Sequence, residues 1–204
     1  PAALTRLLDL RKEFGVQNLA HQVARLLNPG RIPSQVIGIA HPPYLDKMAE
    51  ALDMLGAKRA LIIQGVEGFP ELSISAPSPA RELRGGHISP LTFRPQDAGL
   101  RIGPFQTMSQ GAATETASIP AQEAALIHAL LTNRQRGDQR AWVILNAALL
   151  IYAAGLAPSL AQSTPVAIDA LDSGKAGALL QSISREPKTH KRLPSSIPTA
   201  TVTT

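Results

Sequence analysis

Residues 11–29 carry a group of cationic side chains that a plain core helix would not need. Arg11 and Lys12 are adjacent, and Arg25 follows His21 by one helical turn. Cations with this spacing attract anionic groups, either the phosphate of a small substrate or the backbone of a nucleic acid. The same residues are also typical of an ordinary solvated helix surface. The sequence therefore offers a candidate anion-binding stretch and leaves its partner open.

Two short helices are expected to carry these cations. Leucines recur at helical spacing over residues 3–14, and Gly15 is a typical residue for ending such a helix. A second apolar periodicity covers residues 19–27, with Asn18 in the position of an N-cap. Residues 28–30, with the sequence Asn-Pro-Gly, predict the end of that helix.

A strand–helix–strand unit follows, and it predicts where a ligand would bind. Residues 35–40 and 59–64 are short, apolar and rich in aliphatic side chains, which is typical of buried strands. Residues 45–55 have helical periodicity between them, so the two strands should be parallel, with a right-handed crossover. Ligands in such sheets bind at the carboxyl ends of the strands. Those ends are residues 40–42 and 64–71.

The remainder of the chain continues the alternation of strands and helices. Shorter strands are predicted at residues 72–74 and 87–93, on either side of the Gly85-Gly86 turn. Helices are predicted at residues 121–131, 140–154, 164–173 and 175–183, the last two as a pair or as one long helix.

These elements predict one α/β domain over residues 1–184, with a parallel-rich sheet flanked by helices. Residues 185–204 are rich in Pro, Ser, Thr and Lys and have no apolar period. Such a segment cannot bury enough apolar surface to fold, so we expect a disordered basic tail there.

The composition limits the classes of protein to which the chain can belong. It has 204 residues, of which 44% are hydrophobic, enough for the packed core of one substantial domain. The absence of Cys excludes disulfides, thiolate metal sites and a cysteine nucleophile, and it fits a cytoplasmic protein. The most apolar run, residues 142–156, is too short for a membrane span, so we expect no membrane partner. The net charge of +5 fits an anionic partner and ordinary solubility alike.

The order of these segments resembles the anthranilate phosphoribosyltransferase family, a relative of the pyrimidine nucleoside phosphorylases. Residues 11–29 look, without a gap, like the family stretch Arg-Lys-x-Leu-Gly-x-Arg-Thr-x-Phe-Asn-x-Leu-Gly-Pro-Leu-x-Asn-Pro. Residues 35–65 look like its strand–helix–strand unit. Leu145-Asn146-Ala147-Ala148 and residues 168–176 look like its last two helices. The resemblance covers about residues 5–183 and implies the large domain of the nucleoside phosphorylase and phosphoribosyltransferase fold.

The family also has an amino-terminal helical region and a Gly-Thr-Gly-Gly-Asp loop that binds diphosphate. Neither occurs in these residues, where Gly85-Gly86 is the single Gly-Gly pair. The resemblance therefore implies an incomplete domain that corresponds to the carboxyl-terminal portion of a family member. We expect this portion alone to be inactive, and the full-length form to be a homodimer.

The resemblance implies phosphoribosyl transfer from phosphoribosyl diphosphate to an aromatic amine, as in tryptophan biosynthesis, with Mg²⁺ as cofactor. Arg11 matches the arginine that contacts the carboxylate of the aromatic acceptor, a task suited to a guanidinium group. Glu71 matches the second of two adjacent carboxylates that hold magnesium on the diphosphate. Pro70 stands in place of the first, and Glu67 lies close enough in sequence to compensate for it. No side chain is assigned as a catalytic nucleophile.

Three departures from the family pattern suggest an alternative function. His21 stands where the family has Asn, and Ala24 and Arg25 replace its Gly-Pro pair. These residues resemble a divergent branch of the family that has been associated with nucleic-acid binding. In that interpretation Arg11, Lys12 and Arg25 form a basic patch on a protein without transferase activity. The sequence leaves both functions open.

Overall fold

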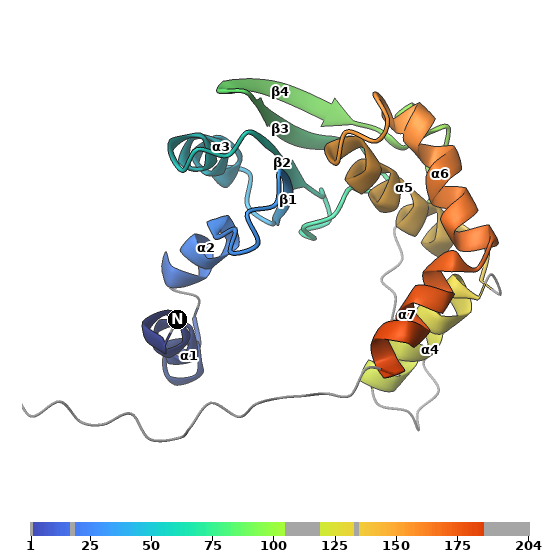
Figure 1. Ribbon diagram of the computed structural model, residues 1–204, viewed down its shortest axis with the longest axis horizontal. Helices are drawn as coiled ribbons and strands as arrows, with labels where there is room; N and C mark the ends of the chain where they lie inside the picture. The colour runs from blue at the N-terminus through green and yellow to red at the C-terminus, as the bar shows by residue number, and fades with distance from the viewer. Residues whose placement is uncertain (1, 17–18, 105–118, 133–134, 186–204) are drawn as a thin grey trace, which may run out of the picture.

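The computed structural model describes residues 2–16, 19–104, 119–132 and 135–185. Asn18, the predicted N-cap, lies outside these residues, and so does the predicted tail except for Arg185, which ends the last helix. The described part of the chain forms a mixed α/β fold in which one sheet is flanked by helices (Figure 1).

The sheet contains four strands in the order β1-β2-β3-β4. Their bounds are Ser34–Ile39, Arg59–Gln64, Ser78–Arg84 and His87–Phe93. β1 and β2 are parallel, with Ser34 opposite Arg59, and helix α3 (Tyr44–Met54) crosses over between them, as predicted. The other two pairs are antiparallel. The expectation of a parallel-rich sheet is therefore wrong beyond the first pair. Residues 65–77 return the chain from β2 to β3 without a crossover helix, and the tight Gly85-Gly86 turn reverses it again after β3.

The predicted strand at residues 72–74 does not form, although its side chains are buried. Leu72 and Ile74 are each 1% exposed, but the backbone of this segment does not join the sheet. Its backbone groups find partners outside the sheet instead: the amide of Ser73 donates to Ser78 Oγ at 2.8 Å, and the carbonyl of Ile74 accepts from the amide of Gly103 at 3.1 Å. The strand that does form, β3, contains a proline, Pro79, which pairs with β4 alone and so removes no hydrogen bond from β2.

In the described residues, the α-helices match the predicted ones in number and sequence order. Their bounds are Ala2–Phe14 (α1), Leu19–Leu26 (α2), Ile119–Leu131 (α4), Asp138–Ala153 (α5), Leu160–Asp172 (α6) and Lys175–Arg185 (α7), with a short 3-10 helix (η1) at Pro95–Ala98. Helix α6 begins earlier than predicted. Ser159 caps it by accepting a hydrogen bond from the amide of Gln162 at 3.3 Å, and Pro165 lies inside the helix rather than at its start.

Two layers of helices cover the sheet, because alternate residues of β2 point to opposite faces. Leu61 and Ile63 pack with buried leucines of α5 and α6. Ala60 and Ile62 pack with α3 on the other face. β2 is thus buried on both faces, which explains its continuous apolar sequence.

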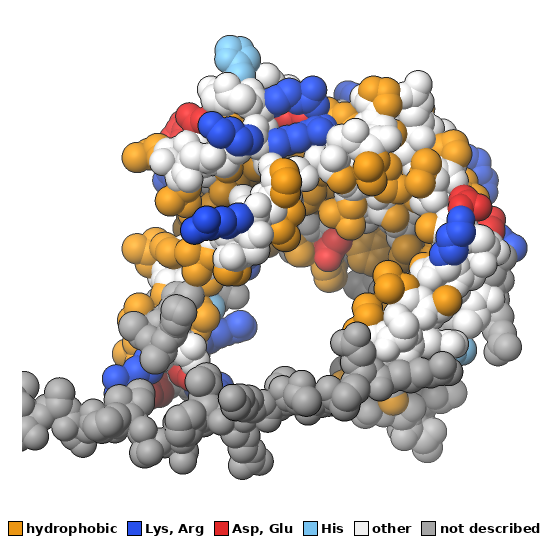
Figure 2. Space-filling model, viewed as in Figure 1, with side chains coloured by type: hydrophobic (Ala, Val, Ile, Leu, Met, Phe, Trp, Pro, Cys, Tyr) orange, Lys and Arg blue, Asp and Glu red, His pale blue; other side chains and the backbone are white. Residues whose placement is uncertain are grey.

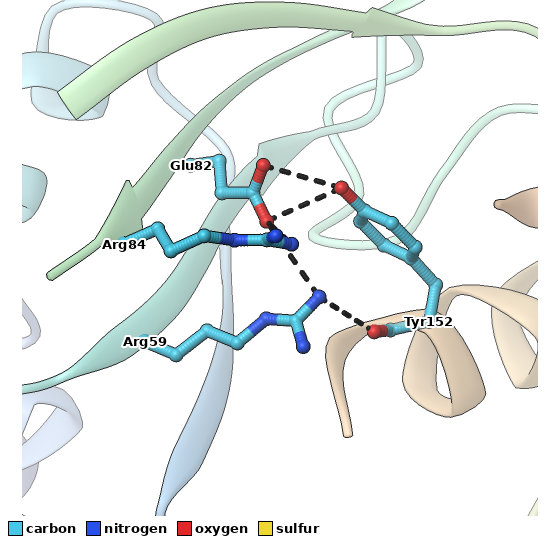
Figure 3. A network of polar contacts seen from close by, with 4 residues as sticks. All are labelled: Arg59, Glu82, Arg84 and Tyr152. Atoms are coloured by element: carbon cyan, nitrogen blue, oxygen red, sulfur yellow. Dashed lines mark hydrogen bonds and ion pairs between the residues drawn. The ribbon is translucent and has the colours of Figure 1, made fainter. Parts of the chain in front are cut away.

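Helix α5 is also attached to the sheet by a polar network (Figure 3). Arg59 donates a hydrogen bond to the backbone carbonyl of Tyr152 at 2.8 Å and lies 3.7 Å from the Glu82 carboxylate. The Tyr152 hydroxyl donates to Glu82, with both carboxylate oxygens at 3.2 Å, and Arg84 pairs with the same carboxylate at 2.9 Å. The network therefore fixes the position of α5 along β2 and β3.

The remaining helices extend away from the sheet on two sides. In Figure 1, α1 lies beyond α2 on one side, and α4 lies beside α7 on the other. Figure 2 shows hydrophobic side chains on the surface of both extensions. In α7, Leu179 and Ile183 are each 61% exposed. Within the described residues, no helix is both long enough and apolar enough to span a membrane.

Candidate functional site

A pocket of about 510 Å³ lies at the carboxyl ends of β1 and β2, where the strand–helix–strand pattern predicts ligand binding. Aliphatic side chains of β1, β2 and α5 form its walls. Its charged residues are Arg25, from the last turn of α2, and Glu71, from the loop after β2. Asn146 of α5 contributes a neutral polar group. The pocket thus combines one cation, one carboxylate and an apolar surface.

The loop after β2 reaches the pocket because two glycines let the backbone pass closely. A Cβ atom on Gly38 would lie 1.9 Å from the carbonyl oxygen of Pro70, and one on Gly65 would lie 2.4 Å from that of Glu71. The amide of Gly65 also donates to the carbonyl of Phe69 at 3.0 Å. Any other residue at position 38 or 65 would push the loop away from the strand ends. Pro70, which stands in place of the first carboxylate of the family pattern, lies against Gly38 of β1.

The Leu72 clamp, formed by Trp142 and Asn146 of α5, holds the other end of this loop. Asn146 Oδ1 accepts a hydrogen bond from the amide of Leu72 at 2.8 Å, and Asn146 Nδ2 donates to the Leu72 carbonyl at 3.2 Å. The indole Nε1 of Trp142 donates to the same carbonyl at 2.7 Å. The backbone next to Glu71 is therefore tied to α5 by three hydrogen bonds.

The Glu71 carboxylate has one oxygen that is available to a cation or a hydrogen-bond donor. It is half-buried, and its Oε2 atom is buried without a hydrogen-bond partner among the described residues. Burial raises the pKa of the Glu71 carboxyl above its ordinary value, and a hydrogen bond from its own backbone amide lowers it part of the way back. A partner that supplies positive charge would remove this penalty.

Glu67 is held differently. Its Oε1 atom accepts hydrogen bonds from the hydroxyls of Ser73 and Ser75. Ser73 Oγ in turn accepts from the amides of Ser75 and Ala76, at 2.9 and 3.1 Å. The Oε1 atom of Glu67 thus stabilises the loop of residues 67–76. Its Oε2 atom is buried and has no hydrogen-bond partner within the described structure.

Of the two residues proposed as metal ligands, Glu71 lines the pocket and Glu67 does not. Glu71, and the unpartnered oxygen of Glu67, are hard oxygen donors of the kind that Mg²⁺ prefers. Nowhere in the described ranges do three or more His, Cys, Asp or Glu side chains gather around one point. The described residues would therefore supply one or two ligands to such an ion, and substrate and water would supply others.

The cations predicted from the sequence do not all meet at this pocket. Arg11 is exposed in the last turn of α1 and is not among the residues that line it. Lys12 is exposed as well and forms an ion pair with Asp9 at 2.9 Å. Arg25 alone of the three lies at the pocket, together with Glu71. On the face seen in Figure 2, the Lys and Arg side chains are spread over several elements rather than gathered in one patch.

Sequence reasoning missed Gly38, Gly65, Trp142 and Asn146 as site residues. Asn146 is the one for which the sequence carries a signal, since it is a lone amide in a long apolar run. A polar group in such a helix needs a buried partner. That the partner is the peptide of Leu72 depends on packing between segments 74 residues apart.

A family model described as the a/b domain of the glycosyl transferase family matches residues 2–177. An anthranilate phosphoribosyltransferase from Desulfitobacterium hafniense strain Y51 is 32% identical over 181 residues, which are 89% of this chain and 52% of the relative. One from Moorella thermoacetica is 34% identical over 173 residues, 85% of this chain and 49% of the relative. The chain therefore spans about half the length of the curated relatives that it matches.

Solved structures give the same picture. Anthranilate phosphoribosyltransferase from Thermus thermophilus is similar with a TM-score of 0.71 and 31% identity, over 89% of this chain and 51% of that one. The enzyme from Saccharomyces cerevisiae, in complex with PRPP and Mg, is similar with a TM-score of 0.72 and 17% identity, over 88% and 50%. At that lower identity the likeness concerns the fold alone.

Proposed function

Because this chain belongs to the glycosyl transferase family through its α/β domain, we propose that the full-length protein transfers a phosphoribosyl group from phosphoribosyl diphosphate to an aromatic amine. Relatives that share about a third of its residues are anthranilate phosphoribosyltransferases, which supports a reaction of the tryptophan-biosynthesis type. The chain corresponds to about half of those proteins, so the proposal concerns the complete polypeptide. We also propose that the complete protein is a homodimer.

The observation that carries the proposal is the pocket at the ends of β1 and β2, with Arg25 and Glu71 in its lining. Transfer of a phosphoribosyl group requires that two substrates be held together and that the charge of the leaving diphosphate be neutralised. A protein nucleophile is not required for this. An apolar pocket with a free carboxylate oxygen and a nearby guanidinium group suits both tasks.

Glu71 would hold magnesium, with Glu67 as a second ligand through its free oxygen. Magnesium bound there would offset the negative charge of the diphosphate. The Saccharomyces cerevisiae enzyme, which shares this fold, was solved in complex with PRPP and Mg, so the fold accommodates magnesium together with this substrate. Arg11 would orient the acid group of the acceptor from α1, and Arg25 would add positive charge at the pocket itself.

The test is an assay of the full-length protein for pyrophosphate release from phosphoribosyl diphosphate and anthranilate, with and without Mg²⁺. We expect magnesium-dependent turnover and a loss of about 100-fold in Glu71→Gln, since ligands of catalytic metals typically have large effects. Glu50→Gln, which removes an exposed carboxylate of α3, serves as the charge-matched control and should retain activity. Wild-type protein with no turnover above background under either condition would overturn the proposal for this acceptor.

Nucleic-acid binding is the second candidate. The observation in its favour is that Arg11, Lys12 and Arg25 are all exposed on a chain with a net charge of +5. Such side chains would contact phosphates without reading sequence. The pairing of Lys12 with Asp9 weakens the candidate, because it offsets one of the three charges.

A further inference from the structure

The peptide of Leu72 is held by side chains rather than by backbone. The amide and the carbonyl of Leu72 both bond to the Asn146 amide group, and the carbonyl also accepts a hydrogen bond from Trp142. The side chain of Leu72 is 1% exposed, so these backbone groups would be left without partners if the Leu72 clamp were absent.

The orientation of the Asn146 side chain is fixed by its own helix. Its Nδ2 atom donates to the carbonyl of Trp142 at 3.0 Å as well as to that of Leu72. The amide oxygen therefore has to face the Leu72 amide. The Arg59–Tyr152 contact, less than two turns further along α5, fixes the position of this helix relative to β2. Asn146 consequently presents a rigid two-point partner to the loop.

Glu71 lies between two fixed points. On one side, the close contacts of Gly38 and Gly65 with the loop leave no room for backbone movement toward the strands. On the other side, the Leu72 clamp holds the next residue in the chain. Glu71 and Asn146 line the same 510 Å³ pocket, and both also line a second, apolar pocket of about 290 Å³ beside Trp142. Without the clamp, Glu71 would be free to turn from one pocket to the other.

We propose that Asn146 is a positioning residue, which acts with Trp142 through the peptide of Leu72 to hold Glu71 toward the cation and diphosphate end of the site. This inference rests on the proposed function for the role of Glu71. A leucine at position 146 would bury more apolar surface in the same space, so packing alone does not explain an amide there. The neutral amide also adds no charge that would compete with Glu71 for a cation.

The test uses the full-length protein, Asn146→Leu, which removes all three hydrogen bonds of Asn146 at similar volume, and Val143→Ala as control. Val143 lies on the same helix and lines the apolar pocket beside Glu71. Two quantities are measured by amide NMR: the exchange rate of the Leu72 amide, and the Mn²⁺ concentration that broadens the Glu71 and Leu72 signals in the presence of inorganic diphosphate. We expect Asn146→Leu to accelerate exchange and to raise the Mn²⁺ midpoint about tenfold, as for other residues that orient metal ligands. Val143→Ala should change neither quantity.

A normal Mn²⁺ midpoint in Asn146→Leu, with or without faster exchange at Leu72, would overturn the inference. So would a wild-type protein whose Glu71 signal does not respond to Mn²⁺ and diphosphate. If Asn146→Leu raises the Mn²⁺ midpoint but the wild-type protein shows no phosphoribosyl transfer, the positioning role is supported and the proposed reaction is overturned. The Mg²⁺ concentration for half-maximal turnover, where turnover exists, should rise by the same factor with little change in kcat.

Discussion

Arg59 contacts Tyr152 at two points: its guanidinium group donates to the Tyr152 carbonyl at 2.8 Å and lies 5.2 Å from the centroid of the Tyr152 ring. The carbonyl belongs to the last turn of α5, where a cation is favourable. Gly155, next to this contact, has a φ of +77°, a conformation that favours glycine, and a Cβ atom there would lie 2.9 Å from the Arg59 guanidinium. Burial, with a further contribution from Glu82, raises the pKa of the Tyr152 hydroxyl, which therefore stays protonated as a donor to that carboxylate.

Removal of Arg59 should destabilise the chain more than removal of its neighbour Arg84. The Arg59 side chain is only 20% exposed, and its removal would leave the Tyr152 carbonyl and Glu82 with fewer partners. Arg59→Ala should therefore lower the free energy of unfolding by about 2–3 kcal/mol. Arg84 pairs with the same carboxylate but is 61% exposed, so Arg84→Ala should cost less than about 1 kcal/mol. Urea denaturation of both variants measures the difference. Equal losses would contradict the role given to the α5 carbonyl.

Gly38→Ala should displace the loop that carries Glu71. The new methyl group would overlap the Pro70 carbonyl, for which we expect a loss of roughly 1–3 kcal/mol in stability and a higher Mg²⁺ requirement. Gly30→Ala is the matched control, because a Cβ there meets only the flexible side chain of Ile32, at 3.3 Å. It should change stability by less than about 0.5 kcal/mol. A Gly38→Ala protein with normal stability would show that the loop can move without penalty.

The stability of the chain should depend on pH through Glu71. Since burial raises its pKa in the folded state, the folded chain binds this proton more tightly than the unfolded chain does. The stabilisation that comes from this tighter proton binding is thus fully present below pH 4.5, the ordinary pKa of the carboxyl. It is lost as the pH rises through the raised pKa of the folded state. Glu71→Gln should therefore be more stable than wild type near neutral pH, and this gain should shrink below pH 4.5.

Thermal unfolding of wild type and Glu71→Gln across this pH range checks the sign. Glu50→Gln, on the exposed face of α3, should alter stability little at any pH. A Glu71→Gln variant that is less stable than wild type near neutral pH would mean that the ionised carboxylate has a partner beyond those described here.

Arg25→Glu separates the two candidate functions. If the full-length protein binds nucleic acid through phosphate contacts, its affinity for a short DNA duplex should fall steeply with salt, and Arg25→Glu should reduce the salt slope by about one. Arg101→Glu, which reverses another exposed cation, should keep the wild-type slope if the patch is the one proposed. Fluorescence anisotropy over a salt series measures both. Wild-type binding that is absent or insensitive to salt would remove the nucleic-acid candidate.

The sequence by itself was sufficient for the elements that depend on local periodicity. The helices, the parallel β1–α3–β2 unit and the turn at Gly85-Gly86 are all present, because apolar spacing and glycine positions determine them within a few residues. The position of the pocket followed as well, since a parallel pair with a crossover helix brings both strand ends to one edge. The prediction of a strand at residues 72–74 was wrong. The sequence indicated that this segment is buried, but burial does not imply that its backbone pairs in the sheet.

Only the tertiary structure decided which side chains meet at that edge. Arg25 lies with Glu71 at the pocket while Arg11 does not line it, although the two arginines are equally plausible in the sequence. Glu67 uses one oxygen to accept from Ser73 and Ser75, and Asn146 bonds to a peptide 74 residues earlier in the chain. Contacts of this kind depend on where the α5 helix lies on the sheet. That position results from the summed packing of the core and the Arg59–Tyr152 contact, to which no local sequence pattern corresponds.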